Sequence, residues 1–183
     1  ATGSAAGCGN IAFATEPLAH ALRVKFFIEG YYRGPDSMIA AINPLGQDTI
    51  ADSVTICLAH QSPPNTILYS SPAALTIYGV ATGYFPQPIL GQDYYIVIKH
   101  RNALETWSSL AFGFNDPDTL YDFSDSLGKA FGNNMVEVDS GVFAFHSGDI
   151  DQNLVINQAD YDLLQTKISQ FAYGYLPEDL SGD

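Results

Sequence analysis

The sequence predicts a mainly β protein, an antiparallel β-sandwich of the immunoglobulin-like or jelly-roll-like kind, followed by one loop and one helix. Segments rich in Val, Ile, Tyr and Phe recur at intervals of about ten residues, separated by Gly, Pro, Asn or Asp. Hydrophobic residues make up 46% of the chain, enough for a core. After Gly148 the apolar residues change from strand spacing to helical spacing.

Three regions follow from this pattern. Residues 1–20 form an N-terminal arm of small residues whose "NIAFAT" alternates, so it is either a flexible arm or a strand that pairs with another subunit. Residues 21–147 form the β-sandwich domain, and residues 148–183 form the loop and helix segment. The arm and the last segment therefore flank a single β body.

The strands of the body are expected in chain order. The first, 21–31, places Leu22, Val24, Phe26 and Ile28 on one face, and the second, 53–60, does so with Val54, Ile56 and Leu58. The segment 93–101, "DYYIVIKHR", gives the strongest β signal. The other expected strands are 65–71, 74–85, 106–114, 119–123, 135–139 and 141–148.

One helix is expected near the C-terminus. Apolar residues recur there at helical spacing, namely Tyr161, Leu164, Ile168 and Phe171. Gly174 is the expected stop.

The charge of the chain excludes several classes of partner. Acidic residues outnumber basic ones by 20 to 7, and the net charge is −13. Without a basic stripe to neutralise phosphates, we expect no binding to nucleic acid or to anionic membranes. No run is apolar enough for direct membrane insertion. An acidic chain with only 15% charged residues is typical of a secreted, extracellular or cell-surface protein.

The stretch "GDIDQNLVINQAD", residues 148–160, concentrates oxygen donors directly before the helix. Calcium takes about six to eight oxygens, and a loop of about twelve residues supplies them from positions 1, 3, 5, 7, 9 and 12. Counted from Asp149, those positions are Asp149, Asp151, Asn153, Val155 (through its carbonyl), Asn157 and Asp160. At position 8, Ile156 is expected to pin the loop to a core. The pattern predicts a Ca2+ site, although an Asx-rich turn that caps the helix remains an alternative.

This stretch resembles a type I dockerin repeat, an EF-hand-like loop with the pattern G-D-x-N-x-D-G-x-V/I-N-x-x-D. The resemblance implies the five side-chain ligands Asp149, Asp151, Asn153, Asn157 and Asp160. Leu154 stands where the pattern has Gly, and a left-handed Leu costs about 1–2 kcal/mol. Asp179, Ser181 and Asp183 alternate like the first half of a second, truncated repeat, which is a possible second metal site.

The body also resembles a known module. The stretches "LRVKFFIEG", "YYIVIKHRNALETWSS" and "LYDFSDSLGKAFGNNMVEVDSGVFAFHSGDID" resemble a β-rich module of secreted surface proteins of Bacteroidota, which commonly leads into a dockerin-like repeat. The resemblance covers about residues 21–183. It implies a bacterial cell-surface context rather than a particular activity.

Other residues offer weaker candidate sites. The acids Asp116, Asp118, Asp122 and Asp125 suit a polar turn better than a metal or catalytic site. His60, His100 and His146 each end a strand, and nothing in their spacing indicates zinc. Trp107 is either core or a sugar platform. Cys8 and Cys57 are expected to form a disulfide in a secreted protein, with two unrelated thiols as the alternative.

These features together predict a secreted, calcium-binding structural or adhesion module at the bacterial cell surface. A sharper version is a self-assembling filament subunit whose arm adds a strand to a neighbour. The alternatives are a dockerin-type module that docks onto a cohesin-like partner, and a carbohydrate-binding module. No hydrolase, zinc-protease, P-loop or dinucleotide motif occurs, so we do not expect an enzyme. The expected partners are protein subunits or glycans.

Overall fold

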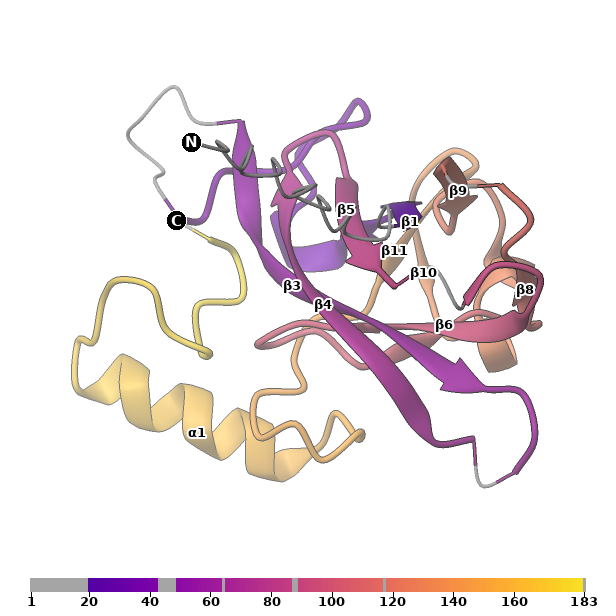
Figure 1. Ribbon diagram of the computed structural model, residues 1–183. Helices are drawn as coiled ribbons and strands as arrows, with labels where there is room; N and C mark the ends of the chain where they lie inside the picture. The colour runs from indigo at the N-terminus through magenta and orange to yellow at the C-terminus, as the bar shows by residue number, and fades with distance from the viewer. Residues whose placement is uncertain (1–19, 43–48, 64, 87–88, 117, 183) are drawn as a thin grey trace, which may run out of the picture.

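The computed structural model describes residues 20–42, 49–63, 65–86, 89–116 and 118–182, and there the chain is mainly β with a C-terminal helix (Figure 1). The larger sheet of this described part has eight strands, in the order β7-β6-β3-β4-β5-β1-β9, with β8 also paired to β6. Of the expected arm, residues 1–20, only His20 is among the described residues, and it begins the first strand. The strands are β1 (His20–Lys25), β3 (Ile50–His60), β4 (Ile67–Thr76), β5 (Val80–Phe85), β6 (Asp93–Lys99), β7 (Thr106–Trp107), β8 (Phe112–Gly113) and β9 (Asp118–Asp122).

The long strand β3 lies at the centre of this sheet. It pairs antiparallel with β4 on one side and with β6 on the other. Ile56 and Leu58 are buried on one face, as the alternation predicted. Cys57 and Ala59, which point the other way, are buried as well and pack in a second, smaller cluster. Because both faces are covered there, residues 56–59 of this strand form a continuous apolar run.

Two parallel pairings correct the expectation of a wholly antiparallel sandwich. β1 pairs antiparallel with β5 but parallel with β9. In a separate three-stranded sheet, β2 (Phe27–Ile28) runs parallel to β11 (Val142–Phe145), which pairs antiparallel with β10 (Val136–Asp139). Side chains alternate with period two in either pairing, so the sequence pattern does not distinguish them. The result is a curled sheet with a small second sheet, which fits a sandwich only loosely.

The expected strand 21–31 is divided between the two sheets. Its backbone turns at Phe26, whose N–H donates to the carbonyl of Gly79 at 2.9 Å. After β2 the chain forms a 3-10 turn, η1 (Glu29–Tyr31). The Phe26 ring stacks on Phe145 with centroids 4.7 Å apart, and Phe145 meets Phe123 edge-to-face at 5.2 Å. These aromatic side chains join the two sheets into one core.

The prediction of one continuous strand over 106–114 is wrong. Only the two-residue strands β7 and β8 form there, and the chain between them leaves the ladder. The Ser108 hydroxyl accepts from the N–H of Ile96 at 3.0 Å and donates to the carbonyl of Leu110 at 2.8 Å. A side chain thus takes over hydrogen bonds that a continuing strand would have made.

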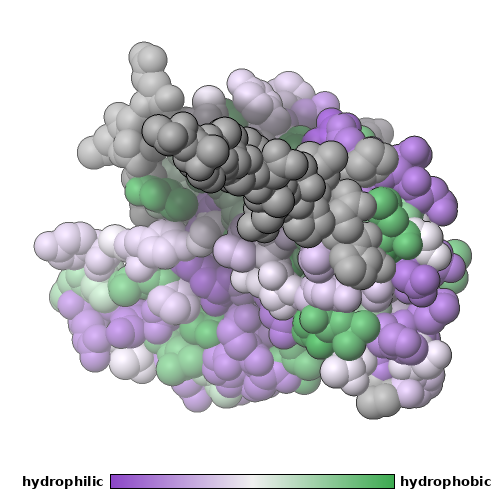
Figure 2. Space-filling view, in the orientation of Figure 1, coloured by the Kyte–Doolittle hydropathy of each residue, from purple (hydrophilic) through white to green (hydrophobic). Residues whose placement is uncertain are grey.

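The predicted helix is present as α1 (Gln158–Ser169), which lies beside the sheets at the lower left of Figure 1. It ends before Gly174, the expected stop, because Phe171 already adopts a left-handed conformation with φ +52°. Its apolar residues are largely uncovered, with Tyr161 51% and Ile168 64% exposed. Figure 2 shows hydrophobic and hydrophilic residues mixed over this part of the surface. No helix among the described residues has the length and apolar character needed to cross a membrane.

Candidate metal centre

The oxygen-rich loop starts where the chain leaves the small sheet. The N–H of Gly148 donates to the carbonyl of Asn102 at 2.7 Å, and the Asn102 side-chain amide donates to the carbonyl of Asp179 at 2.7 Å. A Cβ at Gly148, where φ is +123°, would lie 3.2 Å from Ile156. Ile156, which was expected to pin the loop to a core, lies beside Gly148 but is 44% exposed, so it is only partly covered. Asn102 therefore anchors both the start of the loop and the returning C-terminal segment.

Three of the predicted ligands converge in the structure. Carboxylate oxygens of Asp149, Asp151 and Asp160 all lie within 4.8 Å of one another. Asp149 and Asp160 are buried, whereas Asp151 is exposed. Three negative charges at this separation repel one another, and a cation placed among them would replace that repulsion with attraction. The cluster is therefore able to hold a metal ion.

The backbone between the carboxylates closes tightly around them. Leu154, at the position where the dockerin pattern has Gly, has a left-handed conformation with φ +71°, and Gln152 has φ +59°. The N–H groups of Asn153 and Leu154 donate to the two oxygens of Asp149 at 3.0 and 3.2 Å. A left-handed Leu costs about 1–2 kcal/mol, which these hydrogen bonds to a buried carboxylate offset.

Asp160 also starts helix α1. Asn157 and Asp160 form a capping box, in which Asp160 Oδ2 accepts from the N–H of Asn157 at 2.9 Å. Its Oδ1 accepts from the N–H of Ile150 at 2.7 Å. Burial raises the pKa of Asp160, but the backbone N–H groups outweigh burial and hold that pKa below its ordinary value. Asp160 is thus ionised at neutral pH and ties the start of the loop to the helix.

The pKa of Asp149 moves in the other direction. Burial is the largest cause of its rise, and the charges of Asp160 and Asp151 add to it, while the N–H groups of Leu154 and Asn153 oppose it. The charged form of Asp149 is therefore disfavoured where it lies. A bound cation would relieve this penalty and would be held by the same oxygens.

The remaining predicted ligands lie on the same loop but close its turns. Asn153 Oδ1 accepts from the N–H of Val155 at 2.9 Å, and the carbonyl of Val155 accepts from Asn157 Nδ2 at 3.0 Å. Asn157 Oδ1 accepts from the N–H of Ala159 at 2.8 Å. Together with the carboxylates they form a set made only of hard oxygen donors, which suits Ca2+ or Mg2+ rather than metals that prefer nitrogen or sulfur.

The possible second metal site, at Asp179, Ser181 and Asp183, contacts the β body instead of forming a carboxylate cluster within the described residues. Asp179 Oδ2 lies 3.6 Å from Arg101 Nη2. The carbonyl of Ser181 accepts from Arg33 Nη2 at 3.0 Å. Asp183 lies outside the described residues, so metal binding by this half-loop stays a prediction.

A buried polar network, which the sequence did not predict, fastens this C-terminal segment. Asp52 is fully buried, and its Oδ2 accepts from the Tyr31 hydroxyl at 2.8 Å and lies 3.0 Å from both Arg101 Nε and His100 Nε2. Its Oδ1 accepts from the Tyr175 hydroxyl. Burial raises the pKa of Asp52, but the hydrogen bonds from His100, Tyr175 and the N–H of Ser53 outweigh it, and the pKa lies well below the ordinary value. We call these five residues the Asp52 network.

Two further contacts hold the same segment against the body. The Arg101 guanidinium lies over the Tyr175 ring, 4.3 Å from its centroid. A Cβ at Gly30 would lie 2.0 Å from the carbonyl oxygen of Leu180, so the backbone approach requires glycine. The loop, α1 and the returning chain are therefore tethered to the β body at both ends. In the sequence, only the polar stretch "HRN" at 100–102 hinted at this network. The buried carboxylate that it contacts, Asp52, lies about fifty residues earlier in the chain.

The other candidates do not assemble into sites. In the acidic group the carboxylates pair separately, as Arg23–Asp118 at 3.0 Å, Lys129–Asp125 at 3.8 Å and Ser124–Asp122 at 2.7 Å. His60, His100 and His146 do not come together either. Within the part of the chain that the structure describes, Asp149, Asp151 and Asp160 are the group in which three potential metal ligands come together.

Cys57 is a buried free thiol on β3, with its Sγ 3.4 Å from Ser70 Oγ. Cys8, its expected disulfide partner, lies outside the described residues. The disulfide therefore stays a prediction.

Comparisons with known proteins assign no family. No protein family model matches the sequence, and no curated protein matches it. A solved structure titled "Crystal Structure of S.CueP" is similar with a TM-score of 0.31 and 7% identity, covering 56% of this chain and 59% of that chain. The chain thus spans less than two thirds of that protein, and a likeness at this level carries no conclusion about function.

Proposed function

We propose that this chain is a calcium-stabilised β module with a structural or adhesive role at the bacterial cell surface. The observation that carries the proposal is the convergence of Asp149, Asp151 and Asp160 in a loop with an oxygen donor at each expected position. One ion there would join the first residue of the loop to the first turn of α1. Dockerin-like repeats, which this loop resembles, use the ion in this way.

Calcium binding would add directly to folding energy. The unfolded loop has no preformed site, so any affinity of the folded loop for the ion stabilises the folded state. Helix α1 depends on this help because Tyr161 and Ile168 bury little surface. The Asp52 network attaches Tyr175, after the helix, to the β body. The ion would add a second attachment, between the start of the loop and the first turn of α1.

The binding experiment compares two variants of the same helix region. Asp151→Asn removes an exposed ligand without opening the core, and Asp162→Asn removes an exposed carboxylate that lies outside the ligand positions. By calorimetric titration we expect one calcium ion per wild-type chain and affinity weakened by about tenfold or more in Asp151→Asn, since a charged ligand is lost. Asp162→Asn should bind like wild type. Equal affinities in the two variants, or a wild type that binds no calcium, would reject the site.

The filament version of the proposal rests on the N-terminal arm. Light scattering in calcium would compare the full chain with a chain that lacks residues 1–19. We expect large assemblies that disappear on truncation if the arm adds a strand to a neighbour. Assembly that is equal in both chains would exclude the arm, and no assembly in either would leave an adhesive role.

Docking onto a cohesin-like partner is the second candidate function. The exposed apolar side chains of α1 favour it, because Tyr161 and Ile168 offer an uncovered surface. Capture from the native cell surface by wild type, but not by a Tyr161→Ser/Ile168→Ser variant, would support this function. Equal capture by both would exclude the helix as the docking surface.

A further inference from the structure

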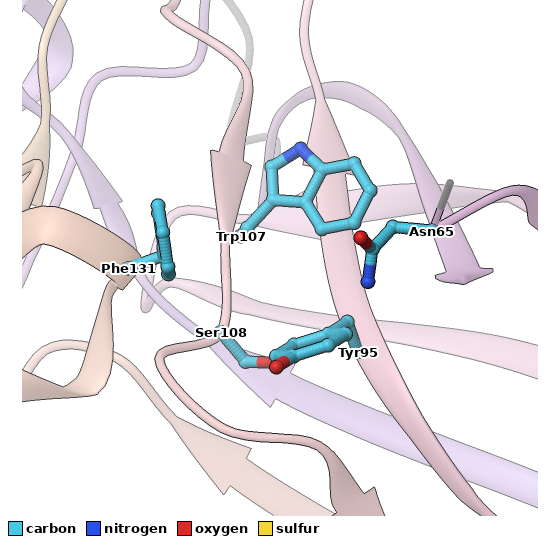
Figure 3. A pocket seen from close by; sticks show the side chains of 5 residues that line it. All are labelled: Asn65, Tyr95, Trp107, Ser108 and Phe131. Atoms are coloured by element: carbon cyan, nitrogen blue, oxygen red, sulfur yellow. The ribbon is translucent and has the colours of Figure 1, made fainter. Parts of the chain in front are cut away.

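A cavity of about 410 Å³ opens beside β7, at the edge of the larger sheet (Figure 3). Its volume lies in the usual range of small-molecule sites, about 300–1,000 Å³. It shares no lining residue with the metal loop. Its walls come from β6, β7, the turn after β3 and the 3-10 turn η4 (Phe131–Asn133), and are formed by Asn65, Tyr95, Trp107, Ser108 and Phe131.

Aromatic rings form most of these walls. The Trp107 and Tyr95 rings lie 6.2 Å apart between centroids and are inclined by 56°, which leaves a wedge between them. Phe131 borders the cavity from η4 and is 67% exposed. The three rings surround the cavity without filling it (Figure 3). The exposed Phe131 ring is accessible to a ligand that enters the cavity.

The Trp107 ring is held in place before any ligand binds. Its Nε1 donates to Glu105 Oε1 at 2.7 Å, and Glu105 Oε2 lies 2.7 Å from Lys99 Nζ. This chain of polar contacts satisfies the indole N–H and fixes the ring orientation. A rigid aromatic wall loses little conformational entropy when a ligand stacks on it.

The polar groups of the cavity are few and uncharged. Asn65 Nδ2 donates to the carbonyl of His60 at 3.2 Å, which leaves Oδ1 to accept from a ligand hydroxyl. Figure 3 shows this amide between the Trp107 and Tyr95 rings. Among the described residues, the Tyr95 hydroxyl has no hydrogen-bond partner and is able to donate or accept. The site therefore offers apolar faces and a few neutral hydrogen-bonding groups.

This chemistry selects a neutral sugar over other ligands. The apolar C–H faces of a sugar ring stack on aromatic rings, and its hydroxyls suit neutral amide and phenol groups. The lining residues carry no positive charge and the chain has a net charge of −13, which disfavours phosphates and anionic glycans. Strand addition by a peptide needs a longer edge than β7 provides, with its two residues.

We propose that this aromatic cavity binds a neutral polysaccharide through stacking on Trp107, Tyr95 and Phe131. The activity goes beyond the proposed metal function, because no residue is shared between the two sites. It would give a surface module a direct means of attachment to glycans.

The chain contains a single tryptophan, so its fluorescence reports on this cavity alone. The probes are soluble neutral oligosaccharides, namely maltohexaose, xylohexaose, cellohexaose and chitohexaose, each titrated in calcium and again in chelator. We expect a saturable change in tryptophan emission with at least one of them. A change that is equal in calcium and chelator would confirm that the cavity acts independently of the metal loop.

The test variant is Phe131→Ala, which keeps the reporter and removes an exposed ring. We expect its dissociation constant to rise by about tenfold, as for loss of an aromatic anchor. The control is Phe171→Ala, an equally drastic change at an 87% exposed ring outside the cavity, which should bind like wild type. No saturable change with any probe, an unchanged constant in Phe131→Ala, or a response to apolar peptides alone would overturn the proposal.

Discussion

Removal of one hydroxyl tests whether the Asp52 network fastens the C-terminal segment. In Tyr175→Phe, Asp52 Oδ1 keeps the hydrogen bond from the N–H of Ser53 at 2.7 Å but loses the hydrogen bond from the Tyr175 hydroxyl. A hydrogen bond to a charged group contributes about 1.5–3 kcal/mol. Tyr175 is 49% exposed, so solvent replaces part of the lost contact and we expect a loss of about 1–2 kcal/mol. Phenylalanine preserves the stacking of Arg101 on the ring.

The assay is thermal and urea unfolding of Tyr175→Phe beside a matched control. Tyr173→Phe makes the same chemical change two residues away, at a side chain that is 94% exposed. For a chain of this size, about 1–2 kcal/mol corresponds to a fall in Tm of about 2–8 °C. The control should stay near the wild-type value. Equal midpoints in the two variants would refute the assignment of the network as an anchor.

Three further predictions concern the same attachments. Gly30→Ala should lower the free energy of unfolding by about 1–3 kcal/mol, because the new methyl group overlaps the Leu180 carbonyl; an unchanged urea midpoint contradicts this packing. The pKa of Asp52 is lower in the folded state than its ordinary 3.8, so its stabilisation is complete above that pH and is lost as the pH falls below it. Wild type should therefore lose its stability advantage over Asp52→Asn below about pH 4, and a difference that is constant with pH contradicts this. Asp160→Asn should cost about 1 kcal/mol in chelator through the helix cap, and more in calcium; an equal cost in both contradicts a metal role.

Local features were predictable from the sequence. Alternating residues such as Leu22 and Val24 identify a strand because burial of one face is a local pattern, and both are buried. The oxygen-rich loop was predictable for the same reason, since its donors lie within twelve consecutive positions. The sequence left open whether Leu154, at the position where the pattern has Gly, keeps the turn, and the structure gives it a left-handed conformation with φ +71°.

Long-range features were not predictable in this way. The parallel pairing of β1 with β9 joins segments nearly a hundred residues apart and leaves no mark on either strand's alternation. Asp52 directly precedes the expected strand 53–60 and carries no local sign of burial, and only the fold brings His100 and Tyr175 to it. The aromatic cavity likewise combines Tyr95 and Phe131 from separate elements.

Thermal unfolding of the full chain, in calcium and then in chelator, tests the central claim most directly. With calcium at about a hundred times its dissociation constant, the metal site should stabilise the fold by about 2.7 kcal/mol. For a chain of this size we therefore expect a Tm about 5–10 °C higher in calcium than in chelator. An identical Tm in both would contradict the account and would leave Asp149, Asp151 and Asp160 as a turn that caps α1.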